Sequence, residues 1–362
     1  MNITIIGGGN IGCTLATKFS LKANVTLFVG SNNDYRDYIK NMKIINPDTN
    51  SITVANISKI TESLEDSLKE ADYVFITYPQ FLFEKLAKDM FPFVKKGTHL
   101  VFVPGSGGAE FWFKHFLDKQ CTITGLQRVH CVARIIDKGK SVKECGVKKS
   151  LKIASIPNSF NKEAKNVLEE LYNLPIELLH NYANITLINS NSILHTSRLY
   201  CLFKNYTHDL IYNYIPLFYE EWDMESAEVL AKLDNELQEI LQVLSNNDMD
   251  MSGIIDILTY YDSTNTTQLK NKLCSISGFK GIKTPSVELT NGFKPDFESR
   301  YFIADFPYGL DIILSFAEIC GTKKDTLQLV SNWYYKITNT HRVFNLNQFN
   351  INNLNDIISF YK

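Results

Sequence analysis

Short apolar runs alternate with amphipathic stretches through the first half of the chain. The runs at residues 2–6 and 24–29 are rich in β-branched side chains and predict the first two strands, with a helix at about residues 12–22 between them. Four further strands are predicted at residues 72–77, 100–103, 121–126 and 150–156. Because strands that alternate with helices build parallel sheets, this half predicts a doubly wound Rossmann fold.

The second half shows helical periodicity instead. Apolar residues recur every three or four positions in three segments, residues 189–213, 226–245 and 308–337. Residues 263–301 are less periodic and contain several glycines and prolines, so we interpret them as an excursion across the domain surface. The predicted class is α/β, with a Rossmann dinucleotide-binding domain at residues 1–184 and a mainly α-helical substrate-binding and catalytic domain at residues 185–362.

Composition argues against several kinds of partner. Hydrophobic residues make up 44% of the 362 residues, which is enough for two buried cores. The 37 Lys and Arg are balanced by 39 Asp and Glu, and the net charge of −2 argues against nucleic acid or an anionic membrane as a partner. We therefore expect small-molecule substrates, and the oligomeric state stays open, with a homodimer as one outcome.

The cysteines and the lengths of the apolar runs indicate the cellular compartment. The seven cysteines are an odd number without a CxxC pair and lie mostly in apolar surroundings, so we interpret them as reduced core thiols and expect no metal site. We find neither a secretory leader after Met1 nor an uninterrupted apolar run of ~18 residues. A cytoplasmic protein is expected.

One run matches the dinucleotide-binding pattern GxGxxG: Gly7-Gly8-Gly9-Asn10-Ile11-Gly12. It follows the first predicted strand and opens the first predicted helix, which is the context that the pattern requires. Gly7 permits a tight turn, Gly9 leaves room for the pyrophosphate, and Gly12 allows the helix to pack closely on the strand. The free amides of the helix N-terminus attract phosphates, so we expect Asn10 and Ile11 to contact the cofactor as well. The alternative is a tight turn without a ligand.

The end of the second predicted strand carries no carboxylate, although an acid there commonly holds the ribose 2′-hydroxyl of NAD. Ser31 and Asn32 can instead donate hydrogen bonds to a 2′-phosphate, and Arg36 can supply the charge that neutralises it. We therefore predict NADP rather than NAD, with Asp34 as the counter-candidate that favours NAD. Two loop residues after later strands are also expected to contact the cofactor, Pro79 and Gly105.

Reduction of a carbonyl or an imine by a hydride also needs a proton donor, and histidine suits that task near neutral pH. Composition does not choose among the seven histidines. His195 is distinguished by Asn191 one helical turn before it, because two polar side chains then share one face of an otherwise apolar helix. The alternative is a histidine with a structural role in the core or at the surface.

Asp305 is a charged residue flanked by aromatic residues just before a predicted helix. A carboxylate next to a histidine fixes its tautomer and favours the imidazolium, so Asp305 is the candidate partner of His195. The alternative is a helix cap, with Pro307 in the first turn. Arg300 could bind a substrate carboxylate through two nitrogens, although a single arginine is more often a surface residue.

Several segments together form a pattern: residues 7–12, Thr77-Tyr78-Pro79, residues 104–111, Val132-Ala133-Arg134-Ile135, Asn191 with His195, Phe218-Tyr219-Glu220-Glu221, and residues 300–310. With these motifs the sequence resembles the octopine/nopaline, or opine, dehydrogenases over nearly the whole chain. The last segment, with Asp305-Phe306-Pro307-Tyr308-Gly309-Leu310, is the most distinctive, because Asp-x-Pro-x-Gly-Leu is not a general Rossmann feature.

Enzymes of this family join the amine of an amino acid to a 2-oxo acid such as pyruvate and reduce the resulting imine with a nicotinamide cofactor. The resemblance implies that His195 is the catalytic acid and base, that Asp305 is its carboxylate partner, and that Asn191 orients substrate. It also implies that Arg300 and Arg134 hold a substrate carboxylate.

Two departures from the family pattern bear on geometry and cofactor. Thr196 stands where a proline often follows the histidine, and the strand-end acid of NAD-using members is missing. Two other functions stay open. A 2-oxo or 3-hydroxy acid reductase of related architecture would act without an amine, and a dinucleotide sensor would not catalyse at all. The presence of both His195 and Asp305 argues against the sensor.

Overall fold

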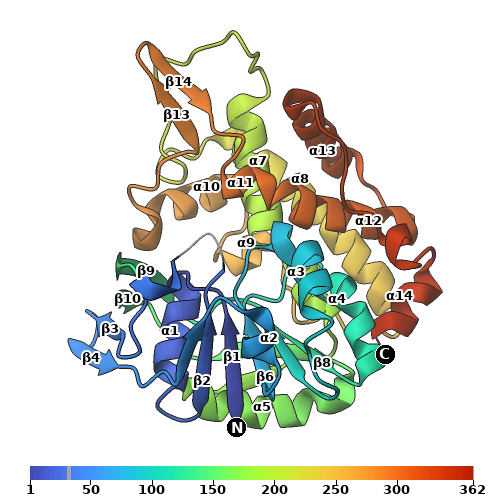
Figure 1. Ribbon diagram of the computed structural model, residues 1–362. Helices are drawn as coiled ribbons and strands as arrows, with labels where there is room; N and C mark the ends of the chain where they lie inside the picture. Colours follow the sequence, from blue (N-terminus) through green and yellow to red (C-terminus); the bar gives the residue numbers. More distant parts are fainter. Residues whose placement is uncertain (31–33, 362) are drawn as a thin grey trace. The chain divides into compact units, whose positions relative to one another are not determined.

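The computed structural model describes residues 1–30 and 34–361. Contacts within the described chain divide it into two compact units (Figure 1). The first unit is Met1–Thr186 together with Tyr361, and the second is Leu187–Phe360.

The first unit is built on an eight-stranded sheet. Its order is β12 (Ile176–Leu178), β11 (Leu151–Ile156), β8 (Thr122–Leu126), β7 (His99–Phe102), β6 (Tyr73–Ile76), β1 (Asn2–Ile6), β2 (Asn24–Phe28) and β5 (Lys59–Thr61). From β5 to β8 the neighbouring strands are parallel and follow the 3-2-1-4-5-6 order of a Rossmann fold, which confirms the predicted class. β11 pairs antiparallel with β8, so the sheet is mixed and not parallel throughout as predicted.

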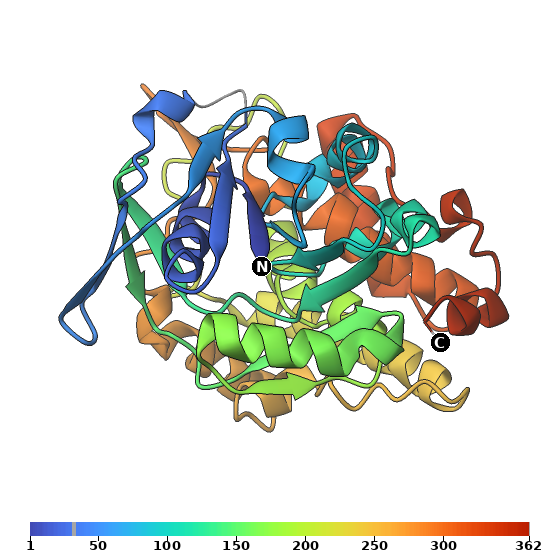
Figure 2. The same ribbon diagram turned by 60° about the horizontal axis from the view of Figure 1, so that its bottom comes forward.

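Burial on both faces explains why β1 lies inside this sheet. Ile3 and Ile5 of β1 are almost wholly buried, as expected for a strand that helices cover on both sides. α1 (Asn10–Phe19) contributes Phe19 to the core, where its ring meets Phe75 edge-on with 4.9 Å between centroids. Further helices of the unit are α2 (Leu64–Leu68), α3 (Phe83–Met90), α4 (Ala109–Trp112), α5 (Asn161–Tyr172) and α6 (Ala183–Thr186). Figure 2 shows α5, in green, along the near side of the unit.

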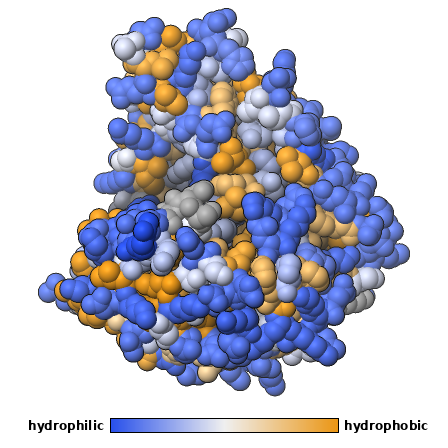
Figure 3. Space-filling view, in the orientation of Figure 1, coloured by the Kyte–Doolittle hydropathy of each residue, from blue (hydrophilic) through white to orange (hydrophobic). Residues whose placement is uncertain are grey.

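A second sheet of the first unit was not predicted. Its four strands are β4 (Ser51–Val54), β3 (Lys43–Asn46), β10 (Ser141–Cys145) and β9 (Val132–Asp137). Part of one face is open to solvent, since Ile52 and Ile136 are more than half exposed. Figure 3 shows hydrophobic side chains, in orange, on the surface near β3 and β4. Because this sheet buries few side chains, its strands lack the continuous apolar runs that mark the central strands.

The second unit is mainly helical. Its longest helix, α8 (Met224–Ser245), packs against α7 (Asn191–Phe203), α10 (Thr266–Ser275), α12 (Asp311–Cys320) and α13 (Asp325–Thr338). α8 buries Leu230, Leu233 and Leu237, at the spacing that the sequence pattern indicates. Shorter elements are α9 (Ile257–Tyr260), α11 (Arg300–Ile303), α14 (Leu354–Tyr361) and the hairpin of β13 (Ser286–Leu289) with β14 (Gly292–Pro295). The predicted excursion thus contains a helix and a hairpin.

The structure also describes the cysteines and the apolar length of the helices. All seven cysteines are free thiols; Cys13, Cys121 and Cys131 are buried, whereas the other four are partly exposed. In the part of the chain that the structure describes, no helix is both long and apolar enough to cross a membrane.

Candidate active site

The glycine loop between β1 and α1 combines two crowded positions with an open one. Gly7 has a φ of +120°, which favours glycine, and a Cβ there would lie 2.6 Å from Oγ1 of Thr77. A Cβ on Gly12 would lie 1.7 Å from the carbonyl oxygen of Gly7, so α1 and β1 pack too closely for a larger residue. Among the described residues, no heavy atom lies within 4 Å of a Cβ built on Gly9. The loop is therefore open where the unpaired amides of the α1 N-terminus can meet an anion.

This open position borders a hollow of about 450 Å³, within the size range of small-molecule sites. It is lined by Gly7, Gly8, Gly9, Phe28, Gly30, Leu64, Thr77, Tyr78, Pro79, Leu82, Lys85, Leu86 and Asp89. Three predicted cofactor residues, Gly7, Gly9 and Pro79, are among them. Lys85 and Asp89 of α3 form an ion pair at the hollow. Sequence reasoning missed this pair because a lysine four residues from an aspartate is typical of any exposed helix.

Other predicted cofactor residues have different surroundings. The side-chain oxygen of Asn10 accepts a hydrogen bond from the backbone amide of Ile135, at 2.8 Å. Ile11 is half-buried in the first turn of α1. Gly105 is buried outside the lining of the hollow, and its carbonyl oxygen accepts a hydrogen bond from the Tyr182 hydroxyl at 3.0 Å. Gly105 therefore packs within the unit.

Arg36, the predicted 2′-phosphate ligand, is paired locally. Its Nη2 lies 2.7 Å from Oδ2 of Asp34, and the side-chain hydrogen bond from Arg36 lowers the pKa of Asp34 to about 2. Both side chains are exposed. A carboxylate and a guanidinium therefore lie together after β2. The carboxylate suits the ribose 2′-hydroxyl of NAD, and the guanidinium suits the 2′-phosphate of NADP. Ser31 and Asn32, the other predicted ligands of the 2′-phosphate, lie outside the described residues.

His195 and Asp305 form a hydrogen-bonded pair within the second unit. Nδ1 of His195 lies 2.7 Å from Oδ2 of Asp305, and the two side chains are 8% and 15% exposed. Asp305 stands at the start of the π-helical turn Phe306–Leu310, yet its carboxylate caps no backbone amide there. Gly309 lets this turn approach α7, because a Cβ at that position would lie 2.9 Å from Oγ of Ser192. The carboxylate is therefore directed to the histidine and not to the helix end.

A tyrosine occupies the other nitrogen of the imidazole. The hydroxyl oxygen of Tyr219 lies 2.7 Å from Nε2 of His195. Burial raises the pKa of Tyr219 well above its ordinary range, so its hydroxyl stays protonated. Tyr301 lies over the imidazole with 4.5 Å between centroids, and Phe218 meets it edge-on at 5.4 Å. Sequence reasoning missed Tyr219 as a site residue because no helical or strand spacing relates two positions 24 residues apart.

The three predicted substrate-binding residues are exposed. Asn191 begins α7 one turn before His195, and Arg300 begins α11 five residues before Asp305. Arg134 lies on β9 in the first unit, where its guanidinium donates to a neighbouring backbone carbonyl. Asn191 and Arg300 therefore share the second unit with the histidine–aspartate pair, whereas Arg134 does not.

One buried cluster has donor atoms that suit a metal ion. Ligand atoms of His130, Cys131 and Glu144 all lie within 4.8 Å of one another. Nζ of Lys18 lies 2.6 Å from Oε1 of Glu144, and Nε2 of His130 lies 3.3 Å from the same oxygen. Because the ammonium group already balances the charge of this buried carboxylate, we assign no ion to the cluster.

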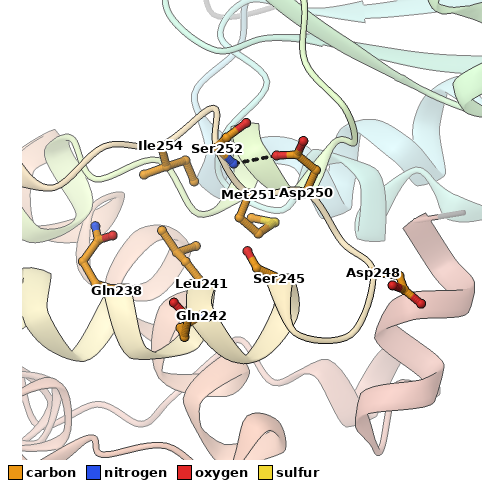
Figure 4. Close-up of a pocket in the computed structure, with 9 residues that line it drawn as sticks. All are labelled: Gln238, Leu241, Gln242, Ser245, Asp248, Asp250, Met251, Ser252 and Ile254. Carbon is orange, nitrogen blue, oxygen red and sulfur yellow. Dashed lines mark hydrogen bonds between the residues drawn. The ribbon is translucent and has the colours of Figure 1, made fainter.

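A second hollow, of about 560 Å³, lies at the end of α8 (Figure 4). It is lined by Gln238, Leu241, Gln242, Ser245, Asp248, Asp250, Met251, Ser252 and Ile254. Figure 4 shows the backbone amide of Ser252 donating to Oδ1 of Asp250, at 2.8 Å. The lining contains no histidine, cysteine or cationic side chain, so we assign no chemistry to it.

Comparisons with known proteins relate both units to dehydrogenases and reductases. Residues 178–338 match the alpha-helical domain of NAD/NADP octopine/nopaline dehydrogenase, and residues 3–158 match ketopantoate reductase PanE/ApbA. Tauropine dehydrogenase of Arabella iricolor is 27% identical over 92% of this chain and 91% of its own length. The chain is a homologue of the opine dehydrogenases. This confirms the resemblance that the motifs indicate.

Two further proteins are similar to this chain over most of its length. The opine dehydrogenase of Haliotis discus hannai is 25% identical over 93% of this chain and 90% of its own length. A structure of octopine dehydrogenase with NADH and L-arginine matches with a TM-score of 0.88 at 21% identity, covering 100% of this chain and 98% of that one. At 21% identity this match shows that the two chains share a fold.

Proposed function

We propose that this homologue is itself an opine dehydrogenase, which condenses the amine of an amino acid with a 2-oxo acid and reduces the imine to an N-(carboxyalkyl) amino acid. The observation that carries the proposal is the 2.7 Å contact between His195 and Asp305. It lies in the part of the chain that matches the octopine/nopaline dehydrogenase helical domain. Octopine dehydrogenase, which shares the fold, has been solved with NADH and L-arginine and with NADH and pyruvate.

The first unit fits a nicotinamide dinucleotide. The open backbone at Gly9 and the N-terminus of α1 would hold its phosphates, beside the hollow that Gly7 and Pro79 line. When bound, the cofactor supplies the hydride that reduces the imine carbon. We propose NADPH over NADH, because Arg36 offers a charge that matches a 2′-phosphate and Asp34, already bound to Arg36, is less able to accept a ribose hydroxyl.

The histidine–aspartate pair handles the protons of imine formation. A carboxylate only accepts hydrogen bonds, so Nδ1 of His195 must donate to Asp305, and protons are exchanged with the reactants on the side of Nε2, which contacts the Tyr219 hydroxyl. Neutral His195 takes a proton from the ammonium group of the amino acid, which frees the amine to attack the oxo carbon. It then returns that proton to the hydroxyl group that leaves the adduct as water. The resulting iminium is the group that is reduced.

The substrates also carry carboxylates that need a cation. Arg300 is exposed, lies in the same unit as the pair, and presents a guanidinium that can bind a carboxylate through two nitrogens. We propose that it holds the 2-oxo acid, that Asn191 orients the bound substrate from the first turn of α7, and that Arg134 makes a secondary contact.

Absorbance of the nicotinamide at 340 nm tests the proposal. NADPH and NADH are supplied with pyruvate or 2-oxoglutarate, with and without a mixture of amino acids. We expect oxidation that requires both the oxo acid and the amine, and faster oxidation of NADPH. The ketopantoate reductase match of residues 3–158 favours one rival, a simple 2-oxo acid reductase. Oxidation with the oxo acid alone would establish that rival, and no oxidation with any pair would favour a sensor.

A further inference from the structure

We infer that the hydroxyl group of Tyr219 relays the proton between His195 and the reactants, so that the acid and base of this site is an Asp305–His195–Tyr219 chain. The inference rests on the proposed function and adds a third residue to its proton machinery. The Oη atom of Tyr219 lies 2.7 Å from Nε2, the one ring nitrogen that Asp305 leaves free. Both imidazole nitrogens are therefore occupied by side chains of the protein itself.

The surroundings of Tyr219 suit a relay. Tyr219 is 4% exposed, and burial keeps its pKa well above the ordinary range, so the hydroxyl stays protonated at neutral pH. A hydroxyl donates one hydrogen bond and accepts others, so it can receive a proton from Nε2 while it passes its own proton on. The ring is fixed by stacking on Phe279, with 4.0 Å between centroids, and on Trp222 at 5.9 Å.

A buried arginine holds the backbone on either side of the tyrosine. Arg198 lies one turn after His195 on α7 and is fully buried. Its Nε donates to the carbonyl oxygen of Phe218 at 3.2 Å, and its Nη2 donates to that of Glu221 at 2.7 Å. Nη1 pairs with Oδ2 of Asp223 at 2.6 Å. The helix that carries the histidine thus also fixes the segment that carries the tyrosine, which keeps Oη and Nε2 in contact.

Two protons move in the relay. The imidazolium Nε2–H bond of His195 breaks as its proton moves to Oη of Tyr219, and the Oη–H bond breaks as its proton moves to the hydroxyl oxygen of the amine–oxo acid adduct. The C–O bond of the adduct then breaks, water leaves, and the nitrogen lone pair forms the iminium. His195 ends neutral and Tyr219 ends protonated. The reverse movement takes the proton from the substrate ammonium group at the start of the cycle.

The Y219F variant tests the relay, since it removes Oη and keeps the stacked ring. We expect kcat of the amine-dependent reaction to fall about 100-fold, with the Kd for NADPH unchanged. Rates in mixtures of H2O and D2O should depend on the deuterium fraction along a curve in the wild type, because two protons move, and along a straight line in Y219F. Nitrogen-15 NMR of His195 should show a changed Nε2 signal in Y219F.

The matched control is Y206F, which removes a hydroxyl from another buried aromatic cluster of the same unit and should keep wild-type kinetics. Equal melting temperatures of Y219F and the wild type would show that the loss is not one of folding. If Y219F melts early, the NMR signal at a temperature where it is folded decides. A Y219F variant with wild-type kcat and a wild-type Nε2 signal would overturn the relay alone. A wild type without amine-dependent turnover would overturn the proposed function, and the relay with it.

Discussion

Nδ1 of His195 lies 2.7 Å from Oδ2 of Asp305, although the two residues are 110 positions apart in the chain. The contact depends on the π-helical turn after Asp305, which Gly309 allows to pack against Ser192 of α7. A half-buried carboxylate with no capping role, placed on a buried histidine, is costly unless it serves that histidine. The proposed chemistry therefore begins from this pair.

The D305N variant should lose catalysis and keep cofactor binding. The amide of asparagine has no charge to stabilise the imidazolium, and it can present an N–H group to Nδ1 and so select the wrong tautomer. We expect kcat to fall by about 10²–10⁴-fold, with NADPH binding unchanged because the glycine loop lies in the other unit. Stopped-flow rates and fluorescence titration with NADPH measure the two effects. D296N, in the same segment, is the control, and wild-type turnover of D305N would refute the role.

Two glycine variants should separate cofactor binding from stability. Gly9 has φ and ψ of −83° and −170°, which alanine tolerates, and no atom of residues 1–30 or 34–361 crowds the position of its missing Cβ. G9A should therefore fold normally and bind NADPH at least about tenfold more weakly, because the methyl group intrudes where phosphate is expected. G12A should destabilise the first unit by about 1–3 kcal/mol, since its Cβ meets the Gly7 carbonyl. Calorimetry measures the binding loss in G9A, and chemical denaturation measures the stability loss in G12A. G278A is the control for both. Tight NADPH binding by G9A would contradict the assigned site.

The Arg36–Asp34 pair should set the choice of cofactor. R36A removes the charge that we match to a 2′-phosphate, so kcat/KM for NADPH should fall about tenfold relative to that for NADH. D34A removes the carboxylate, whose lowered pKa keeps it ionised at neutral pH, and should shift the ratio the other way because Arg36 is released. Initial rates with both cofactors give the ratio. An unchanged ratio in both variants would place cofactor selection elsewhere.

Arg300 and Arg134 make different predictions as carboxylate ligands. R300M should raise KM for the 2-oxo acid about tenfold or more with a smaller effect on kcat, because it removes a charged hydrogen-bonding partner of the substrate. R134M should have the lesser effect, since Arg134 already donates to a backbone carbonyl and lies in the first unit. Steady-state kinetics with the oxo acid as the varied substrate compare them. The reverse order of effects would exchange their roles.

Glu110 should make the first unit less stable as pH rises. It is fully buried, accepts hydrogen bonds from Thr186 and Tyr361, and burial raises its pKa to about 7 from an ordinary value of 4.5. The folded state therefore holds a proton that the unfolded chain loses above pH 4.5, and this stabilisation disappears as pH rises through 7.

The shift corresponds to about 3 kcal/mol, lost between pH 5 and pH 8 in the wild type and absent in E110Q. Urea denaturation at the two pH values measures the difference in the free energy of unfolding. E65Q, which changes an exposed carboxylate of the same unit, should retain the wild-type dependence. An equal slope in E110Q and the wild type would mean that other groups titrate.

The sequence predicts six of the eight strands of the central sheet, because those strands are largely buried and read as apolar runs, as at Ile3 to Ile6. It misses the short edge strands β5 and β12, most of whose residues are not buried. It does not predict β3 and β4, whose side chains are largely exposed, nor the antiparallel pairing of β8 with β11, which no local pattern specifies. The glycine loop is predictable from local sterics as well, since Gly7 and Gly12 lie where a Cβ would clash and Gly9 leaves the loop open.

Some residues around the imidazole of His195 are predictable from the sequence, and others are not. His195 and Asp305 were predicted partly from helical position and aromatic flanks and mainly from family resemblance, since 110 residues separate them. Tyr219 lies in one of the family segments, residues 218–221, but the resemblance gives it no role, and Arg198 lies in none of those segments. Tyr219 contacts His195, and Arg198 contacts the segment at residues 217–223. Both contacts arise from the tertiary packing of α7, and no regular spacing in the sequence predicts hydrogen bonds of this kind.

Mass spectrometry of the product tests whether the amine is joined to the oxo acid. The reactants are NADPH deuterated at the transferred position, an amino acid labelled with nitrogen-15, and pyruvate. We expect one compound that carries both labels, with the mass of an N-(carboxyethyl) amino acid, and its absence when His195 is replaced by alanine. A deuterated 2-hydroxy acid without nitrogen-15 would contradict the proposed function.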